Sequence, residues 1–139
     1  MKENINHIFV DTNVLIGAFM DIDPDKRCLH YLYSLKGKKL YTSSLSIAQL
    51  VSVLQKSKQN AEIKQIVKNI IQKFTILGFI EKDIENSLEL DTADMEDNIQ
   101  FIISQKASCF YFITNNTKDY NKFLTINTLK PIQIRTISQ

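Results

Sequence analysis

The sequence predicts an α/β fold in which helices cover both faces of a mostly parallel sheet. Short apolar runs of β type alternate along the chain with segments whose apolar residues recur at helical spacing. This alternation is typical of βαβ units, in which a helix joins two parallel strands. Only three glycines and two prolines interrupt the 139 residues, so the elements must follow one another closely. A chain of this length holds one core, and we expect residues 1–139 to form a single domain.

The first third of the chain predicts two strands and two helices. His7–Asp11 is an apolar run that ends in a carboxylate, which indicates a buried strand. Thr12–Phe19 follows directly, with apolar residues at the spacing of a helix. A turn around a proline at Asp21–Asp25 then leads into a second helix through Cys28–Leu32. Leu40–Tyr41 is a brief second strand.

Capping residues mark the start of the next two helices. Ser43 or Ser44 can cap a helix that carries its apolar residues over Leu45–Leu54. Asn60 can cap another that runs through Ile63–Ile71. Both helices have an apolar stripe, which is expected to be covered mostly by the core and otherwise by a partner helix or a second copy.

The second half of the chain repeats the pattern. Phe74–Leu77 predicts a strand and Glu81–Leu90 a helix. A helix over Asp94–Gln105 is expected because its apolar residues repeat at i, i+4, i+7 and i+8. Ser108–Ile113 is an apolar, aromatic run typical of a strand buried on both faces. Ile132–Ile134 is expected to be a short final strand.

The composition is that of a soluble globular protein, with 44% apolar and 23% charged residues. No apolar stretch approaches the roughly 20 residues of a transmembrane helix. The start, Met1–Asn4, includes an acid and leads into no long apolar segment, which argues against a signal peptide. We therefore expect a cytoplasmic protein without a membrane partner. Cys28 and Cys109 form no CxxC pair, which predicts buried, reduced thiols.

Positive charge is distributed unevenly along the chain. The net charge of +2 does not by itself indicate a nucleic-acid partner. However, residues 36–61 and 120–139 contain no acid while each carries several basic residues. These segments are either a solvated surface or a basic rim beside an acidic pocket, and the second arrangement would suit a phosphate backbone.

Three groups of polar residues lie where predicted strands end or a predicted helix begins. Asp11 ends the first strand, and a polar segment at 114–119 follows the strand over 108–113. The third group opens a helix and consists of Asp91, Asp94, Glu96 and Asp97. Because the carboxyl ends of parallel strands line one crevice, we expect these groups to form a single site.

The clustered acids predict a metal site. Asp94 and Asp97 are three residues apart, so both lie on one face of a first helical turn. Each acid taken alone, including Asp11, could simply cap backbone N–H groups. Together they repel one another and usually need a cation. Oxygen ligands favour Mg²⁺ or Mn²⁺, and neither His7 nor His30 has a ligand-like spacing. Such a metal can polarise a phosphate and generate hydroxide, which is the chemistry of phosphodiester hydrolysis.

In this order and at these spacings, the motifs resemble the PIN-domain ribonucleases, many of which are toxins of type II toxin–antitoxin pairs. The matching segments span nearly the whole chain: Phe9–Leu15, Thr42–Ser46, Asp94–Gln100 and Phe112–Tyr120. The resemblance implies a three-layer α/β/α fold with a five-stranded sheet in the order 3-2-1-4-5. It also implies Mg²⁺- or Mn²⁺-dependent endoribonuclease activity on RNA, an antitoxin protein that occupies the pocket, and a homodimer.

Carried over residue by residue, the resemblance makes Asp11, Asp97 and Asp94 the metal-binding carboxylates. Asp94 matches an acid found in one subset of the family. Asp119 would join these three as a catalytic acid, at a position that is often acidic when Asn116 replaces the family's other acid. The positions expected to contact the substrate or to support the ligands are Asn13, Gln49, Thr114 and Asn116.

Gln49 departs from the family pattern, which usually has a glutamate on the helix after strand 2. No acid occurs anywhere in residues 36–61, so a shift of one helical turn cannot supply it. Gln49 can still offer a neutral carbonyl oxygen to a metal or its water. The substitution implies weaker metal affinity with activity kept, a site rebuilt around Asp94, or a pocket that binds without cutting. Gln49 would instead face solvent if the helix had a different phase.

Two other functions fit parts of the sequence. A non-catalytic PIN-fold module that binds RNA or protein would account for Gln49 and Asn116, and its RNA binding would survive chelation of metal. A receiver-like phosphoacceptor domain also uses a strand-end aspartate. That class needs an acid pair before the first helix, where His7–Asp11 supplies a single acid.

Overall fold

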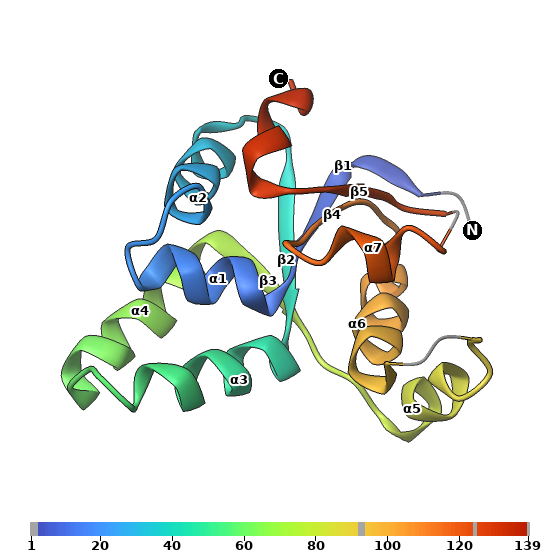
Figure 1. Ribbon diagram of the computed structural model, residues 1–139, viewed down its shortest axis with the longest axis horizontal. Coiled ribbons are helices and arrows are strands. Elements are labelled where there is room, and N and C mark those ends of the chain that lie inside the picture. The colour runs from blue at the N-terminus through green and yellow to red at the C-terminus, as the bar shows by residue number, and fades with distance from the viewer. Residues whose placement is uncertain (1–2, 92–93, 124, 139) are drawn as a thin grey trace.

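The computed structural model describes residues 3–91, 94–123 and 125–138, and its centre is a five-stranded sheet (Figure 1). The strands lie in the order β3-β2-β1-β4-β5, and every neighbouring pair is parallel. This order is the one that the sequence resemblance implies. The strands are β1 (Asn4–Val10), β2 (Lys39–Ser43), β3 (Phe74–Leu77), β4 (Cys109–Ile113) and β5 (Asn127–Leu129).

Helices form a layer on each side of this sheet, which gives the predicted three-layer α/β/α arrangement (Figure 1). One layer contains α1 (Thr12–Phe19), α2 (Asp25–Ser34), α3 (Ser44–Leu54) and α4 (Asn60–Lys73). The other contains α5 (Glu81–Ser87), α6 (Met95–Lys106) and the short α7 (Thr117–Tyr120). A 3-10 helix, η1 (Pro131–Thr136), is the last element of the described residues and packs on α2.

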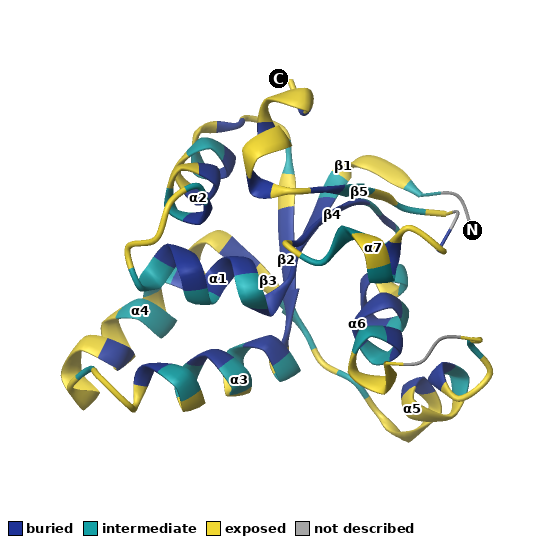
Figure 2. Cartoon of the chain, in the orientation of Figure 1, coloured by how far each residue is buried: buried dark blue, intermediate teal, exposed yellow. Residues whose placement is uncertain are grey.

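Each face of the sheet has its own hydrophobic core, because side chains alternate along the strands. Ile8 and Val10 of β1 face the larger core under α1 to α4, whereas Phe9 between them faces the core under α6. On that second side the ring of Phe9 stacks on Phe112 with 4.9 Å between centroids. Burial on both faces explains the near-continuous apolar runs of the central strands, and Figure 2 shows β2, β4 and the last three residues of β1 largely buried.

Most predicted boundaries agree with the structure to within three residues. The helix Thr12–Phe19 and the strand Phe74–Leu77 match the predictions, and Ser43 caps α3 by accepting a hydrogen bond from the N–H of Ser46. The predicted cap at Asn60 is wrong, because Gln59 occupies that position and Asn60 is already helical. The helix predicted over Glu81–Leu90 ends at Ser87.

The predicted final strand over Ile132–Ile134 is also wrong. These residues form the 3-10 helix η1, which begins at Pro131, where the missing N–H suits the first position of a helix. The fifth strand is Asn127–Leu129, which pairs with β4 in the register Tyr111↔Asn127. Its two polar residues and its length of three residues give no apolar run, so the pattern of the sequence does not reveal it.

Several broader expectations can be compared with this fold. The observed strand order differs from the 2-1-3-4-5 order of receiver-type sheets, which removes that alternative. Cys28 and Cys109 are both buried, as predicted. Lys39 pairs in register with His7 and so lies at the amino end of β2, which places residues 36–39 at the edge of the sheet opposite to Asp11. In the described ranges, no helix combines the length and the hydropathy needed to cross a membrane.

Candidate active site

The polar residues that follow the strands gather at the carboxyl edge of the sheet, as predicted. Asp11 follows β1 and Thr114 follows β4, which is the neighbouring strand. The backbone N–H of Asp11 donates to the carbonyl of Ile113 across 2.9 Å and ties the two strand ends together. Gln49 lies on α3 and Asp97 in the first turn of α6. Segments far apart in the sequence therefore contribute side chains to one location.

The carboxylate of Asp11 is buried and accepts hydrogen bonds on both oxygens. Its Oδ1 accepts from the backbone N–H of Thr12 at 2.8 Å, which caps α1, and from Gln100 Nε2 at 3.1 Å. Its Oδ2 accepts from Thr114 Oγ1 at 2.9 Å and from Asn13 Nδ2 at 3.1 Å. Burial raises the pKa of Asp11 above its ordinary value, and these donors oppose the rise only in part. The donors thus favour the ionised form, which is the form that binds metal.

Asp97 is a second carboxylate with a strongly shifted pKa. Its pKa is raised to about 6, mainly by burial and also by the nearby charges of Asp94 and Asp11. The hydroxyl of Tyr120 donates to Asp97 Oδ1 at 3.0 Å and opposes this shift. Asp97 Oδ2 is buried, and none of the residues that the structure describes gives it a hydrogen bond. A buried carboxylate oxygen without a partner is costly unless a ligand or ion satisfies it.

Asp94 makes the capping contact that was one of its two predicted roles. Its Oδ1 accepts from the backbone N–H of Asp97 at 3.1 Å, at the N-cap of α6. Asp94 is exposed, and it affects the pocket through its negative charge, which raises the pKa of Asp97. Asp91 is exposed too and lies outside the residues that line the pocket.

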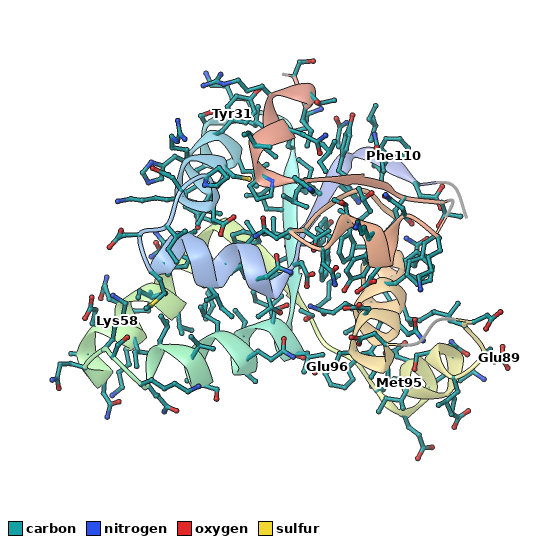
Figure 3. All side chains as sticks on the ribbon, viewed as in Figure 1. Tyr31, Lys58, Glu89, Met95, Glu96 and Phe110 are labelled. Carbon is teal, nitrogen blue, oxygen red and sulfur yellow. The ribbon has the colours of Figure 1, made fainter. Side chains whose placement is uncertain are left out.

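Gln49 faces the pocket rather than solvent. Its Oε1 accepts from Thr12 Oγ1 at 2.7 Å, and its Nε2 donates to Glu96 Oε2 at 2.5 Å. The amide therefore links α3 to the start of α6, and Figure 3 shows Glu96 in the space between these two helices. Glu96 belongs to the acidic cluster noted in the sequence. The structure adds that its carboxylate is held at the pocket by the residue that replaces the family's glutamate.

The loop after β4 supports the carboxylates from the other side. Asn116 donates through its backbone N–H to Thr114 Oγ1 at 3.0 Å and through its Nδ2 to Asp119 Oδ2 at 2.6 Å. The neighbouring carboxyl group of Asp119 is a further cause that raises the pKa of Asp97. Asn13 Oδ1 accepts from a backbone N–H of this loop at 3.0 Å. The structure therefore brings all of the predicted site residues to one edge of the sheet, with Asp94 at its margin.

Sequence reasoning did not assign roles to Gln100 and Tyr120. Gln100 is buried and joins three elements, because its Nε2 donates to Asp11 and to Ser46 Oγ at 2.7 Å while its Oε1 accepts from Ser43 Oγ at 2.6 Å. Its position three residues after Asp97 could have placed it on the face of that acid. Tyr120 comes from a helix of one turn that has no apolar period to predict it.

The donor set of this pocket fits a divalent cation held by two carboxylates. The pocket has a volume of about 260 Å³, and Asp11, Gln49, Glu96 and Asp97 are among the residues that line it. Among the described residues, no three side chains of His, Cys, Asp or Glu come close enough together to hold a metal by themselves. Mg²⁺ is usually bound by one or two carboxylates together with waters and substrate phosphates. Asp11 and Asp97 are two such carboxylates. Asp97 Oδ2 has no partner among the described residues, and the charge of Asp11 is near enough to raise the pKa of Asp97.

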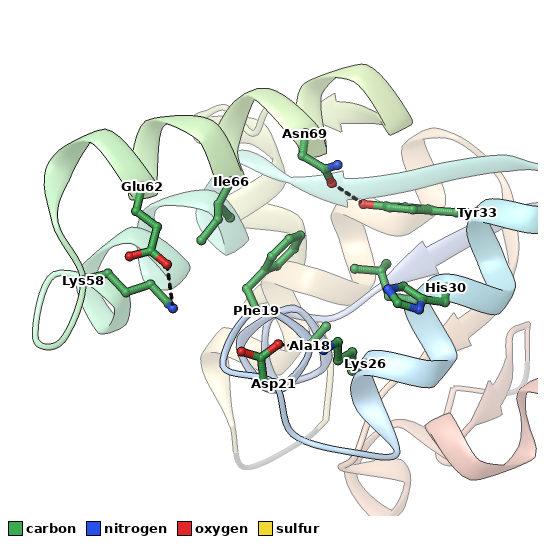
Figure 4. Close-up of a pocket in the computed structure, with 11 residues that line it drawn as sticks. Ala18, Phe19, Asp21, Lys26, His30, Tyr33, Lys58, Glu62, Ile66 and Asn69 are labelled. Carbon is green, nitrogen blue, oxygen red and sulfur yellow. Dashed lines mark hydrogen bonds and ion pairs between the residues drawn. The ribbon is translucent and has the colours of Figure 1, made fainter.

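A larger hollow, of about 370 Å³, lies between α1, α2 and α4 (Figure 4). Its charged side chains are engaged with one another, since Lys26 pairs with Asp21 at 2.9 Å and Lys58 with Glu62 at 3.2 Å. Tyr33 donates to Asn69 Oδ1 at 2.8 Å on the same wall. Because these charged side chains are paired with one another, the smaller acidic pocket is the better candidate active site.

Comparison with known proteins agrees with this geometry. A model of the PIN domain matches residues 7–118. The chain belongs to the PIN domain family. This PIN-domain chain is 26% identical over 141 aligned residues to Ribonuclease VapC1 of Aquifex aeolicus (strain VF5), which covers 90% of this chain and 92% of that relative. The resemblance drawn from the motifs is therefore confirmed for the family.

Solved structures show the same PIN fold. A toxin–antitoxin complex from Klebsiella pneumoniae superposes with a TM-score of 0.68 at 20% identity, covering 89% of this chain and 97% of that one. VapBC2 from Rickettsia felis, bound to a DNA fragment from its promoter, gives a TM-score of 0.66 at 19% identity, with coverages of 89% and 98%. At these identities the likeness concerns the fold.

Proposed function

We propose that this PIN-domain protein is an endoribonuclease that uses Mg²⁺ or Mn²⁺ to hydrolyse phosphodiester bonds of RNA. The observation that carries the proposal is the buried, unpartnered Oδ2 of Asp97, which lines the same pocket as the buried carboxylate of Asp11. The charge of Asp11 raises the pKa of Asp97, and two carboxylates coupled in this way are suited to share a cation. The family membership and the relative named as a ribonuclease support the same activity.

In this proposal Asp11 and Asp97 hold the metal, and the remaining residues hold these two acids. A bound ion would supply a polarised phosphate and a hydroxide nucleophile. Thr114, Gln100 and Asn13 donate hydrogen bonds to both oxygens of Asp11 and orient the carboxylate toward the pocket. Burial raises the pKa of Tyr120, so its phenol keeps the proton that it donates to Asp97. Asn116 holds the carboxylate of Asp119 on α7, the helix that also supplies Tyr120 to Asp97, and we expect the RNA to lie on this side.

The proposal extends to a toxin that an antitoxin protein holds inactive. The relative named VapC1 and the neighbouring toxin–antitoxin structures support that assignment. An antitoxin side chain with a positive charge would satisfy Asp97 Oδ2 in place of a metal. For a homodimer, the supporting feature is an open hollow of about 430 Å³ between α3 and α4, lined by Val51, Ile63 and Val67. The cytoplasm is the expected location for cleavage of cellular RNA.

A second candidate function is a PIN-fold module that binds RNA or protein without cutting. Gln49 favours it, because both ends of this amide are engaged by Thr12 and Glu96 and a third carboxylate is missing at that position. The two functions differ in their response to chelation. A nuclease needs the metal, whereas a binding module retains RNA without it.

The test incubates the purified protein with a mixed RNA pool in Mn²⁺, in Mg²⁺ and in excess chelator, beside Asp11→Asn. The nuclease proposal expects cleavage in either metal, none in chelator and none by Asp11→Asn. A gel-shift measurement in chelator accompanies it. RNA binding without cleavage under every condition would instead support the binding module.

A further inference from the structure

Asp25 is a buried carboxylate that lies away from the acidic pocket, at the start of α2. Its side chain rests on Gly17 of α1, where an added Cβ would lie 1.7 Å from Asp25 Oδ2. Only a glycine at position 17 leaves room for the carboxylate in this place. Burial raises the pKa of Asp25, which means that the site disfavours its charge. A carboxylate kept at such a position needs a compensating partner.

That partner comes from the loop that borders the active site. Asn115 Nδ2 donates to Asp25 Oδ1 at 3.0 Å and lowers the pKa of that acid. The backbone N–H of Asn115 donates to Asn13 Oδ1 at 3.0 Å, and Asn13 Nδ2 donates to Asp11 Oδ2 at 3.1 Å. A continuous series of hydrogen bonds therefore connects Asp25 with the carboxylate of Asp11.

The order of donors and acceptors in this series determines which atom of Asn13 faces Asp11. An asparagine side chain has an accepting oxygen and a donating nitrogen at nearly equivalent positions, so its orientation depends on its partners. The N–H of Asn115 engages the oxygen of Asn13 and leaves the nitrogen for Asp11. If Asn115 moved, the amide of Asn13 could turn and present an oxygen to Asp11 instead of a donor. The two acceptors would repel each other, and the carboxylate of Asp11 would lose one of the hydrogen bonds that fix its orientation.

Stabilisation of α2 does not account for these contacts. An acid in a first helical turn complements the helix dipole equally well while exposed to water. Asp25 is instead 7% exposed, lies against a glycine and accepts its hydrogen bond from a loop 90 residues later in the chain. Pro24 holds the N-cap position of α2 without a side-chain capping bond.

We propose that Asp25 is a positioning residue of the active site, which holds Asn115 so that Asn13 keeps Asp11 in its metal-binding orientation. The catalytic part of this inference rests on the proposed function. The structural part, the coupling of Asp25 to the loop and to Asn13, does not. Partners that orient a metal ligand typically change metal affinity by about 10- to 100-fold when they are lost.

The experiment exchanges the two side chains. Asn115→Asp places two carboxylates face to face and breaks the series, and Asp25→Asn with Asn115→Asp restores a donor and an acceptor at the same net charge. Mn²⁺ affinity by calorimetry, kcat and KM for RNA, and thermal unfolding in chelator are measured for the wild type, both single variants and the exchange. We expect Asn115→Asp to lower Mn²⁺ affinity about tenfold and to reduce kcat more than KM. The exchange should recover both to within about threefold.

Three results would overturn the inference: unchanged Mn²⁺ affinity and kcat in Asn115→Asp, a loss of melting temperature alone, or an exchange that recovers nothing. A separate readout applies if the wild type neither binds Mn²⁺ nor cuts RNA, which would refute the proposed function. Hydrogen exchange of the Asn115 backbone N–H then reports on the series directly. Lost protection in Asn115→Asp that returns in the exchange supports the coupling, and unchanged protection refutes it.

Discussion

The amide of Gln49 donates to the carboxylate of Glu96 with 2.5 Å between Nε2 and Oε2, and this contact spans the mouth of the acidic pocket. A glutamate at position 49 would place two carboxylates at that distance. The structure therefore pairs a neutral residue on α3 with an acid on α6. Of these two residues, the one on α6 carries the negative charge. Glu96 is therefore the hydrogen-bond partner of Gln49 at the position where the sequence resemblance implies a glutamate.

Gln49→Glu is expected to destabilise the metal-free protein and to strengthen metal binding. Like charges replace a hydrogen bond, so the free energy of unfolding in chelator should fall by about 1 kcal/mol. A third carboxylate at the pocket should raise Mn²⁺ affinity several-fold. Thermal unfolding in chelator and calorimetric titration with Mn²⁺ measure the two effects. The matched control is Gln49→Glu with Glu96→Gln, which should recover the lost stability; equal losses in both variants would contradict the pairing.

The raised pKa of Asp97 predicts how stability and metal binding depend on pH. Its pKa rises from the ordinary 3.8 to about 6 on folding, so the folded protein binds this proton more tightly than the unfolded chain. The contribution of Asp97 to stability therefore decreases as the pH rises through this window. In chelator, Asp97→Asn should stabilise the protein at pH 7.5 and have little effect at pH 4. Mn²⁺ affinity of the wild type should rise about tenfold between pH 5 and pH 7. A stability difference independent of pH would contradict this assignment.

Tyr120→Phe removes the donor that lowers the pKa of Asp97. The pKa of Asp97 should then rise further, and the pH at which Mn²⁺ binding reaches half its maximum should move upward. Tyr31→Phe is the matched control, because that hydroxyl also donates a hydrogen bond, at 2.6 Å to the carbonyl of Ile137, but lies far from the acidic pocket. Both variants should lose about 1 kcal/mol of stability. The same pH midpoint in all three proteins would show that Tyr120 does not act on Asp97.

Gly17→Ala tests the packing of α1 against α2. The new Cβ would overlap Asp25, whose carboxylate is buried and hydrogen-bonded and so cannot move away freely. We expect a loss of about 1–3 kcal/mol, which is typical of overpacking. Gly78→Ala is the control, since no atom of the described part of the chain lies within 4 Å of the Cβ that it would add. Urea unfolding of the two variants gives the comparison, and equal stability of both would contradict the close approach of Asp25 to α1.

The fold could be predicted from the sequence because its central elements have a clear period. The strands ending at Val10 and Ile113 are apolar on both faces, and α6 carries a helical repeat next to a capping acid. The peripheral elements follow other rules. Asn127–Leu129 forms a strand because its backbone pairs with the outer edge of β4. A hydropathy pattern does not predict such backbone pairing.

The same distinction applies to the site. Asp11 and Asp97 could be predicted because they sit at the end of a strand and the start of a helix, where position alone brings acids together. The partners of these acids could not, because Gln100, Tyr120 and Asp25 act through side chains whose contacts span 23 to 90 residues of the chain. Such contacts depend on the packed tertiary structure and have no local sequence signal.

The most direct test of the central claim, that Asp11 and Asp97 share a divalent ion, is a calorimetric titration of metal-free protein with Mn²⁺ at pH 7.5. The account predicts one bound ion per chain in the wild type, and at least about a tenfold loss of affinity in Asp11→Asn and in Asp97→Asn. Asp91→Asn, which removes an exposed acid of the same cluster, should bind as the wild type does. Unchanged affinity in Asp11→Asn or Asp97→Asn, or an equal loss in Asp91→Asn, would contradict the claim.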